Sequence, residues 1–452
     1  MAAPEPSRRV SWGSKLAFIF AATGSAVGLG NIWRFPTKVS ENGGAIFVLV
    51  YIVCVVLTGF TVMLAELTIG RHAQKNPVGA FARIKPRSPW KLVGYLGVLT
   101  GVLILSFYAV IAGWAAGYLV KMARGTFQGA ISGEFSKEVF SSFSRDPLQV
   151  LLYFFLVLFI TTFIISRGVK GGIERWTKVL MPLLFLLILF LAVRAVILPG
   201  AEHGVAFYLK PDFSKLSGKV ILFALGQAFF SLSLGMGTMI TYGSYIHKSD
   251  NLVSSAGWVC FSDTLVAVLA GLIIFPTLAF YGLLGKASGV GLIFEAFPLI
   301  FSKIVGGQVF GTLFFLLLLI AAITSTISLL EVPVAFLVDE HNWKREKAAW
   351  IMGLAALVLG IPSGLSTGAS SFFTRINFLG QIDFFFGNIS LAVGALFICI
   401  FVGYAWGVKQ ALNEISIGNE NFKLKPVWSI SIKFLSPMAI LLILFFIKTI
   451  AG

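Results

Sequence analysis

Long apolar stretches alternate with short polar connections along the whole chain. Because a helix needs about 20 apolar residues to cross a bilayer, each stretch is long enough for one span. The pattern therefore predicts an all-α polytopic membrane protein with about eleven transmembrane helices. The stretches occupy residues 13–38, 43–70, 91–123, 148–166, 176–198, 219–247, 253–284, 309–339, 347–363, 376–406 and 428–450.

Composition and charge agree with this interpretation. The chain is 57% hydrophobic and 12% charged, and its net charge of +16 comes from basic residues in short connections. Residues 71–75, 83–87, 167–170 and 344–347 lie in alternate connections, which the positive-inside bias places in the cytoplasm. We therefore expect a multi-pass protein of a cell membrane, in a bacterium the inner membrane. The bilayer and not nucleic acid is its expected partner, with a cytoplasmic N-terminal tail (1–12) and the C-terminus outside.

Two of the stretches, the first and the sixth, are interrupted by glycine. The first contains residues 24–31, GSAVGLGN, and the sixth contains residues 231–237, SLSLGMG. Each glycine costs about 1 kcal/mol relative to alanine in a helix, and broken backbone at membrane depth is tolerated only inside protein or beside a polar cavity. Paired broken helices predict an inverted repeat around a midplane site. The repeats are then residues 13–198 and 219–406, with 428–450 as an accessory span.

Three segments carry a resemblance to a known family. They are residues 24–36, residues 227–235 (QAFFSLSLG) and residues 321–325 (AAITS), in this order. With them the chain resembles the neurotransmitter:sodium symporters, whose prototype is a bacterial leucine transporter. The resemblance implies the leucine-transporter fold with discontinuous helices 1 and 6. It also implies sodium-coupled symport by alternating access.

The resemblance implies two sodium sites built from oxygen ligands, which a hard cation prefers. One would use the carbonyls of Gly24, Val27 and Ala321 with the hydroxyls of Thr324 and Ser325. These hydroxyls could instead bond to their own helix. The other site would use Ala26, Asn31, Ser231 and Asp263, although a shift of one residue would replace Asp263 by Ser262.

Asp263 stands where the family usually has asparagine. An ionised carboxylate within a span is costly and indicates function, although a protonated or helix-capping aspartate is the alternative. Chloride-dependent relatives hold an anion with groups that correspond to Tyr51, Gln227 and Ser231. Since Asp263 would supply this negative charge, we expect chloride-independent transport.

The substrate is predicted from what the first break lacks. Monoamine-transporting relatives carry an aspartate where this chain has Gly28, so the substrate should bring its own carboxylate. The amides of Leu29 and Gly30 and the hydroxyl of Tyr108 would bind that carboxylate, while carbonyls near Ser25, Phe230 and Ser233 would meet the ammonium. The expected substrate is a hydrophobic or aromatic L-amino acid. The resemblance lines its side-chain pocket with Ile104, Phe230, Met236, Ser325 and Leu329.

The resemblance also implies gates at both ends of the path. Outside, Arg34 pairs with Asp383 beyond a lid of Tyr108 and Phe230. Inside, Arg9 pairs with Asp339, supported by Trp12 and Tyr245, although Arg9 could be one more cytoplasmic charge. Gly172 and Pro182 reproduce a helix-unwinding pattern, because glycine loosens a turn and proline removes a donor.

Other functions are weighed against this one. A proton-coupled amino-acid transporter and a non-transporting amino-acid sensor on the same fold are the alternatives. An enzyme is not expected, because the histidines are scattered and no nucleophile stands near a base. The sequence makes no prediction of oligomeric state. These histidines are His72, His203, His247 and His341.

Overall fold

The computed structural model describes residues 10–129, 132–284, 289–419 and 422–447, and every regular element within them is helical. Nine of these helices are long and apolar enough to cross a membrane, and one bent pair makes a tenth. The nine are Ala45–Ala73, Lys91–Ala123, Pro147–Ser166, Val169–Val196, Leu252–Phe280, Gly307–His341, Arg345–Leu365, Phe378–Ala405 and Lys425–Phe445.

The two stretches that glycine interrupts, the first and the sixth, are not among these nine helices. The first is the bent pair, and the sixth is divided into two shorter helices. The first is α1 (Lys15–Ala26) followed by Gly30–Glu41, which includes α2 (Phe35–Glu41), at an angle of 51°. The other is divided between α11 (Gly218–Ser231) and the short α12 (Thr238–Gly243). Counted in this way, the described residues contain the eleven spans that the hydrophobic pattern predicts.

Most span boundaries fall close to the predicted ones. The helix α6 is Lys91–Ala123, as predicted, and α16 (Gly307–His341) is two residues longer at each end than 309–339. The fifth span begins earlier than predicted, because a π-helical segment, η3 (Val169–Glu174), precedes α9 (Arg175–Val196). Residues 448–450 of the last predicted span lie outside the described residues.

Short helices that were not predicted occupy several connections. Their amphipathic pattern is too short to separate from loop sequence, and caps start two of them. Asn76 caps α5 and Ser132 caps α7, because their side-chain oxygens accept hydrogen bonds from backbone amides of the first turn. These helices are α5 (Pro77–Ile84), α7 (Gly133–Arg145), α10 (Ala201–Leu209), α15 (Phe297–Lys303), α18 (Ser371–Arg375) and α21 (Val408–Ser416).

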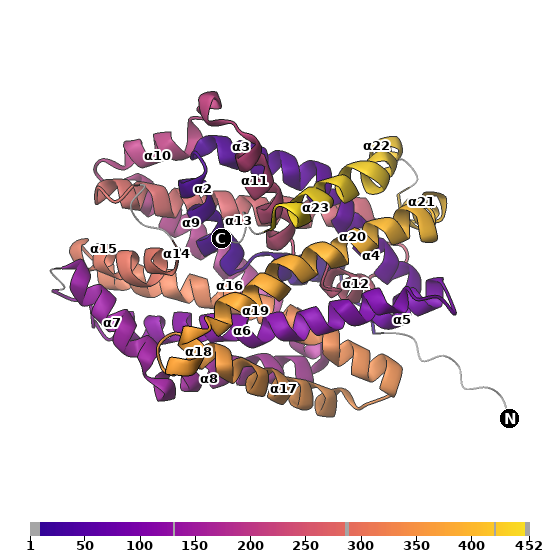
Figure 1. Ribbon diagram of the computed structural model, residues 1–452, viewed down its shortest axis with the longest axis horizontal. Helices are drawn as coiled ribbons and strands as arrows, with labels where there is room; N and C mark the ends of the chain where they lie inside the picture. Colours follow the sequence, from indigo (N-terminus) through magenta and orange to yellow (C-terminus); the bar gives the residue numbers. More distant parts are fainter. Residues whose placement is uncertain (1–9, 130–131, 285–288, 420–421, 448–452) are drawn as a thin grey trace.

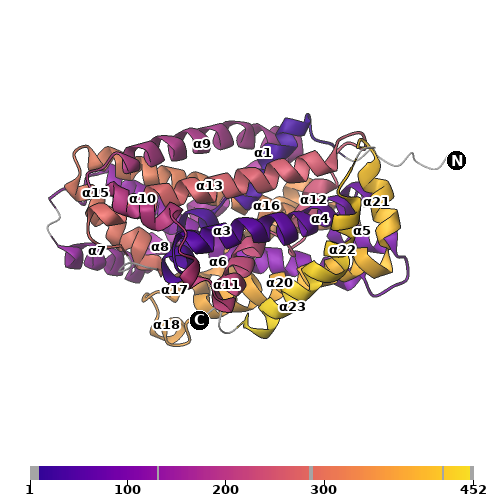
Figure 2. The same ribbon diagram turned by 90° about the horizontal axis from the view of Figure 1, so that it is seen from above.

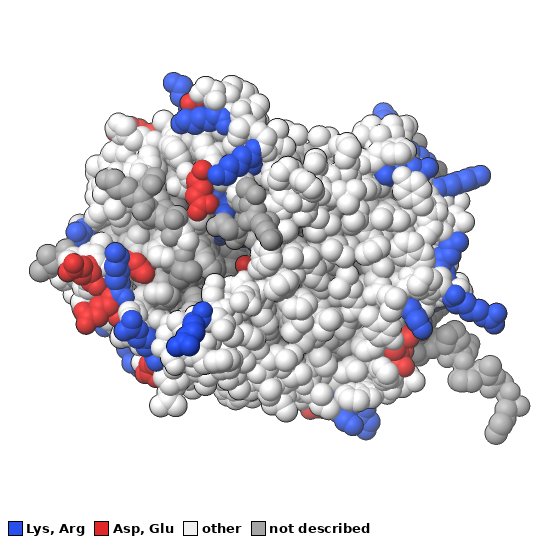
Figure 3. Space-filling model, in the orientation of Figure 1, with Lys and Arg blue, Asp and Glu red and all other residues white. Residues whose placement is uncertain are grey.

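The long helices run roughly parallel to the longest axis of the molecule (Figure 1). The most buried spans are α6 and α16, which pack against each other at the centre. Figure 2 shows α9 and α13 (Leu252–Phe280) side by side along one edge. On the face in Figure 3, charged side chains gather toward the two ends and leave an almost uncharged band between them, as expected of a bilayer-spanning protein.

Glycine allows the second break to pack closely against α20 (Leu391–Ile400). Ser233, Gly235 and Gly237 all have positive φ, which ends α11 and redirects the chain into α12. A Cβ atom added at Gly235 would lie 2.1 Å from the Leu391 carbonyl oxygen. The break is therefore wedged against neighbouring backbone, and a side chain at Gly235 has no room.

Candidate functional site

The first break exposes backbone groups beside a tyrosine hydroxyl. The helix α1 ends at Ala26, and Val27 has an extended backbone. The Leu29 amide donates to the Tyr108 hydroxyl oxygen at 2.9 Å, and the Gly28 amide donates to the side-chain oxygen of Asn31 at 3.0 Å. The tyrosine that was predicted to bind a substrate carboxylate therefore lies directly on the exposed amides.

A hydrogen bond joins the two breaks. The hydroxyl of Ser233 donates to the Ser25 carbonyl at 2.9 Å, which places this predicted ammonium-binding carbonyl between both interrupted spans. The Gly235 amide donates to Oε1 of Glu66 at 2.7 Å. Glu66 lies fully buried in α4 (Phe60–Ala73) and so fixes the second break from behind.

Three carbonyls predicted to bind sodium meet around the hydroxyl of Ser325, a fourth predicted ligand. The Ser325 hydroxyl oxygen lies 3.5 Å from the Gly24 carbonyl oxygen and 3.2 Å from those of Val27 and Ala321. The Thr324 hydroxyl lies 3.0 Å from the same Ala321 carbonyl, so this hydroxyl also bonds to its own helix. One hydroxyl hydrogen serves only one of these oxygens. The converging lone pairs form the kind of oxygen cage that a hard cation prefers.

The second cluster is centred on the carboxylate of Asp263, which is fully buried. The Asn31 amide donates to its Oδ1 at 2.7 Å. The hydroxyls of Ser231 and Tyr51 donate to its Oδ2 at 2.9 Å and 3.1 Å. Asp263 and not the half-buried Ser262 therefore faces this cluster, with hydrogen-bond donors on both carboxylate oxygens.

Gln227 completes the surroundings of this cluster. Its amide nitrogen donates to the Gly30 carbonyl at 3.0 Å, while its Oε1 is buried without a hydrogen-bond partner among the described residues. Of the three groups predicted to correspond to an anion site, Tyr51 and Ser231 thus bind a carboxylate of the protein itself, and Gln227 binds the carbonyl next to Asn31. Ala26, the fourth predicted ligand here, is the last residue of α1.

A cavity of about 220 Å³ opens above the breaks at the end of the molecule opposite to Trp12. It reaches Leu29 and Gly30 and also the predicted lid residues Tyr108 and Phe230. We call this side the cavity end. Its lining also includes Arg34, Asp383, Asn388, Phe107, Ile111 and Leu379.

The predicted direct pair between Arg34 and Asp383 is not formed in this structure. Arg34 instead donates to the side-chain oxygen of Asn388 at 2.7 Å, and its guanidinium lies 4.1 Å from the ring centre of Phe230. The Asn388 amide in turn donates to the Asp383 carbonyl at 3.0 Å. Asn388 thus links Arg34 to the backbone of Asp383, which sequence patterns did not indicate.

The other side of the breaks is closed by Trp12, and we call it the Trp12 end. The Trp12 ring nitrogen donates to the Tyr242 carbonyl at 3.1 Å, and its backbone amide donates to the Tyr245 carbonyl at 3.0 Å. The Tyr245 hydroxyl donates to Glu331 at 2.6 Å. Trp12 and Tyr245, which are predicted to support an inner gate, thus contact each other, and Tyr245 also contacts Glu331.

The other inner-gate residues are only partly visible. Arg9 lies outside the described residues. The carboxylate of Asp339 accepts a hydrogen bond from the Asn76 amide at 2.7 Å, which ties α16 to the start of α5. Asp339 therefore anchors a connection at the Trp12 end.

Two buried acids at the Trp12 end were missed in the sequence. Glu331 in α16 binds both Tyr245 and, in a short ion pair, Arg345. Glu174 accepts a hydrogen bond from the Gly13 amide at 2.8 Å and pairs with Lys178 at 2.6 Å. An acid inside an apolar span was the available signal for Glu331, since such residues are seldom placed there without function.

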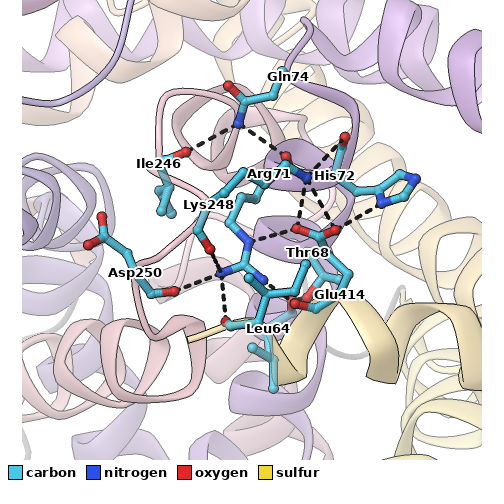
Figure 4. A network of polar contacts seen from close by, with 10 residues as sticks. Leu64, Thr68, Arg71, His72, Gln74, Ile246, Lys248, Asp250 and Glu414 are labelled. Carbon is cyan, nitrogen blue, oxygen red and sulfur yellow. Dashed lines mark hydrogen bonds and ion pairs between the residues drawn. The ribbon is translucent and has the colours of Figure 1, made fainter. Parts of the chain in front are cut away.

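A polar network also holds this end together (Figure 4). Arg71 is fully buried and binds the Glu414 carboxylate at 2.8 Å. Its guanidinium also donates to the Asp250 carbonyl at 2.7 Å. Burial raises the pKa of Glu414, but the hydrogen bond with His72 and the charges of Lys248 and Arg71 outweigh it and hold this pKa at about 2. The network joins α4, the segment after α12 and α21.

The predicted unwinding segment is helical in this structure. Gly172 lies within η3, and a Cβ atom there would be 1.9 Å from the Ile164 carbonyl oxygen. Pro182 lies inside α9. Gly172 is therefore needed for close packing against the end of α8 (Pro147–Ser166), whatever its role in unwinding.

Four of the five residues predicted to line the side-chain pocket are apolar, and the fifth is the buried Ser325. Ile104, Met236 and Leu329 are all buried, and Phe230 is half-buried beside the cavity. A Cβ atom at Gly28 would lie 2.5 Å from the Tyr108 hydroxyl oxygen and 2.6 Å from that of Ser325. The site between the breaks therefore has no space for a larger residue at position 28 unless these hydroxyls move.

Comparisons with known proteins agree over nearly the whole chain. The model of the sodium:neurotransmitter symporter family matches residues 9–131 and 135–451. The sodium-dependent transporter YhdH of Bacillus subtilis is 38% identical over 96% of this chain and 96% of its own length. A sodium-dependent transporter of Haemophilus influenzae is 36% identical over 96% of this chain and 97% of its own. The crystal structure of MhsT in complex with L-phenylalanine is 43% identical, with a TM-score of 0.88, and the match covers 97% of this chain and 99% of that one.

Proposed function

Because this chain belongs to the sodium:neurotransmitter symporter family, we propose that it imports hydrophobic and aromatic L-amino acids with two sodium ions and without chloride. The chain is a sodium-dependent symporter and not an enzyme, and its fold is the predicted leucine-transporter fold. The substrate class, the number of ions and the independence of chloride are the proposal. The repeat bounds 13–198 and 219–406 also stay a prediction.

One observation carries the proposed substrate class. The exposed amide of Leu29 and the hydroxyl of Tyr108 lie together at the first break, and Gly28 places no acid beside them. A substrate carboxylate can accept hydrogen bonds from such groups, and the amides at the start of a helix favour negative charge. An amine without a carboxylate would lack a counter-charge at position 28.

Apolar lining supports a hydrophobic side chain on the substrate. Ile104, Met236 and Leu329 bring no charge to the pocket, and methionine adapts its shape to side chains of different size. MhsT, which is 43% identical, was crystallised with L-phenylalanine. We extend this ligand class to the present chain as part of the proposal.

The two oxygen clusters support two sodium ions. The cage around Ser325 offers carbonyls and hydroxyls, which suit a hard cation. In the other cluster, Asp263 brings a negative charge to a site whose donors would otherwise hold an anion. This carboxylate is our reason to expect transport without chloride.

Alternating access requires that only one end be open at a time. The Trp12 end is closed by Trp12 and Tyr245, while the opposite end has a cavity that reaches Tyr108. We assign the Trp12 end to the cytoplasm on the basis of its basic connections. The cell membrane of a bacterium, with the C-terminus outside, remains the proposed location.

Sodium-dependent binding of radiolabelled L-phenylalanine to the purified protein tests this function. We expect binding in sodium and not in choline, with competition by leucine and tryptophan and none by aspartate or lysine. Tyr108→Phe should weaken binding about tenfold, because one hydrogen bond to a charged group is worth about 1.5 kcal/mol. Tyr118→Phe is the matched control, since Tyr118 lies on the same helix and its buried hydroxyl has no hydrogen-bond partner among the described residues.

Two outcomes would contradict the proposal. No sodium-dependent binding of any of the twenty amino acids would remove the substrate class. Equal binding in sodium and choline that rises at acidic pH would favour the proton-coupled alternative.

A further inference from the structure

A second groove lies at the Trp12 end, on the outer surface and away from the substrate path. It occupies about 680 Å³ between the end of α8 and the start of α9. Its lining combines two arginines with apolar side chains on one exposed surface. The lining residues are Phe163, Arg167, Gly171, Arg175, Trp176 and Val179.

Neither arginine of the groove has a carboxylate partner among the described residues. Among the described residues, no carboxylate lies within ion-pair distance of Arg167 or Arg175, and neither guanidinium donates a hydrogen bond to a described residue. The Arg167 guanidinium lies over the Phe163 ring, 4.7 Å from its centre. The nearest acid in sequence, Glu174, is buried and binds the Gly13 amide and Lys178 instead.

Apolar surface continues from the groove toward the middle of the spans. Trp176 is 40% exposed and Val179 is 61% exposed, and Leu183 and Leu186 follow on the same helix with similar exposure. Phe163 and Phe159 extend the surface along α8. Both helices are long and apolar enough to cross a membrane, so we expect this surface to face lipid chains. Because the arginines lie near the ends of the two helices, at the turn that joins them, we expect them near the headgroups.

We propose that this groove binds an anionic phospholipid, with its phosphate between Arg167 and Arg175 and its acyl chains along Phe163, Trp176 and Val179. A guanidinium matches a phosphate through paired N–H groups, and it is weakly hydrated enough to bind at an interface. Basic pockets between spans on the cytoplasmic side are suited to such headgroups. Because the arginines flank η3, a phosphate bound to both would bridge the two ends of that segment.

A soluble phosphate compound and a phospholipid would present the same phosphate chemistry to the arginines, and the structure offers a way to distinguish them. A soluble phosphate would need only the arginines, whereas a phospholipid would also need the apolar surface beside them. The continuous exposed surface from Phe163 to Leu186 favours the lipid. The proposal does not depend on the substrate, because it uses only the position of α8 and α9 in the bilayer.

Native mass spectrometry of the full-length protein, with the lipid removed and then added back, tests the site. The probes are phosphatidylglycerol and phosphatidylcholine with the same acyl chains. We expect the wild type to prefer phosphatidylglycerol and the double variant Arg167→Gln/Arg175→Gln to lose this preference. The loss should be about fivefold for each arginine, because each basic residue near an anionic surface contributes about that factor.

The matched control is Lys85→Gln/Arg87→Gln, which removes two exposed basic residues from the connection before α6, at the same end of the molecule. The control variant should keep the preference for phosphatidylglycerol. The melting temperature of each variant should stay near that of the wild type. Trp176→Ala should weaken phosphatidylglycerol binding severalfold through loss of the apolar contact.

Three results would overturn the proposal. The first is unchanged phosphatidylglycerol binding in the double variant. The second is an equal loss in the control, which would show a general effect of basic charge. The third is complete displacement of the lipid by millimolar glycerol 3-phosphate, which would show a site for a soluble anion.

Discussion

The two ends of the path through this molecule are closed by different kinds of contact. At the Trp12 end, side chains bind a backbone carbonyl and a buried acid. The Trp12 ring nitrogen donates a hydrogen bond to the Tyr242 carbonyl, and the Tyr245 hydroxyl donates one to Glu331. At the cavity end, Arg34 makes a hydrogen bond to Asn388 and lies beside an open cavity. Several hydrogen bonds therefore close the Trp12 end, whereas few close the cavity end.

This difference has a physical consequence for the transport cycle. The bond from the Trp12 backbone amide to the Tyr245 carbonyl joins two backbones, so opening the Trp12 end requires the segment before α1 to move away from the segment after α12. A single side-chain contact at the cavity end breaks when one rotamer changes. We therefore expect the larger conformational barrier at the Trp12 end, and variants there should have the larger effects.

The largest effect is expected from Glu331→Gln. It leaves the half-buried guanidinium of Arg345 without its fully buried carboxylate partner. Removing one partner of a fully buried pair costs about 3–5 kcal/mol, which sets the upper range for this half-buried pair. The Trp12 end should open, which the labelling rate of a thiol at Ala17→Cys would report, since Ala17 is fully buried. The control is Ser328→Ala on the same helix, whose hydroxyl bonds only locally to the Ser325 carbonyl. Equal labelling in both variants would contradict the proposed closure.

A smaller effect is expected from Glu414→Gln in the network of Figure 4. Loss of the carboxylate beside Arg71 should lower the free energy of unfolding by about 3 kcal/mol. The pKa of Glu414 is lowered to about 2, so its stabilisation is complete above the ordinary carboxyl value of about 4.3 and is lost as the pH falls toward 2.

The melting temperature, measured against pH, checks both parts of this prediction. The difference between wild type and Glu414→Gln should stay constant from about pH 7 to pH 5 and shrink only below about pH 4. His72→Gln serves as a partial control, because the His72 side chain is 42% exposed and contacts only one carboxylate oxygen. A difference that already shrinks near pH 6 would indicate titration of another group.

The smallest effect on stability is expected from Asn388→Ala at the cavity end. It removes the bond to Arg34 and should lower the free energy of unfolding by about 1 kcal/mol. Because Arg34 is then free to pair with Asp383, the substrate affinity should change more than the stability does. A binding titration and a melting curve on the same variant compare the two. A change in stability as large as that of Glu331→Gln would remove the contrast between the ends.

Much of the fold follows from hydrophobic runs and glycine clusters. The run at 91–123 predicts α6 because it is a long apolar stretch without proline, and residues 24–31 predict a break because glycine weakens a helix. The oxygen cage around Ser325 follows from the family resemblance once that break is recognised. Local sequence was sufficient for these features because their causes are local.

Other features depend on which segments meet in space. Glu331 pairs with Arg345 across a turn, and Arg71 meets Glu414 from a distant part of the chain, so neither pair has a local signal. Asn388 was missed for the same reason, because only the fold brings it to Arg34. The groove beside Arg167 could not be predicted either, because it depends on how α8 and α9 lie relative to each other.

The most direct test of the central claim is uptake of L-phenylalanine into proteoliposomes with an inward sodium gradient and gluconate in place of chloride. We predict sodium-driven accumulation at an undiminished rate, because Asp263 supplies the negative charge beside Asn31 and Ser231. In Asp263→Asn, uptake should fall at least tenfold in gluconate and recover in part with chloride. Uptake by the wild type that collapses in gluconate, or accumulation that does not need sodium, would contradict this account.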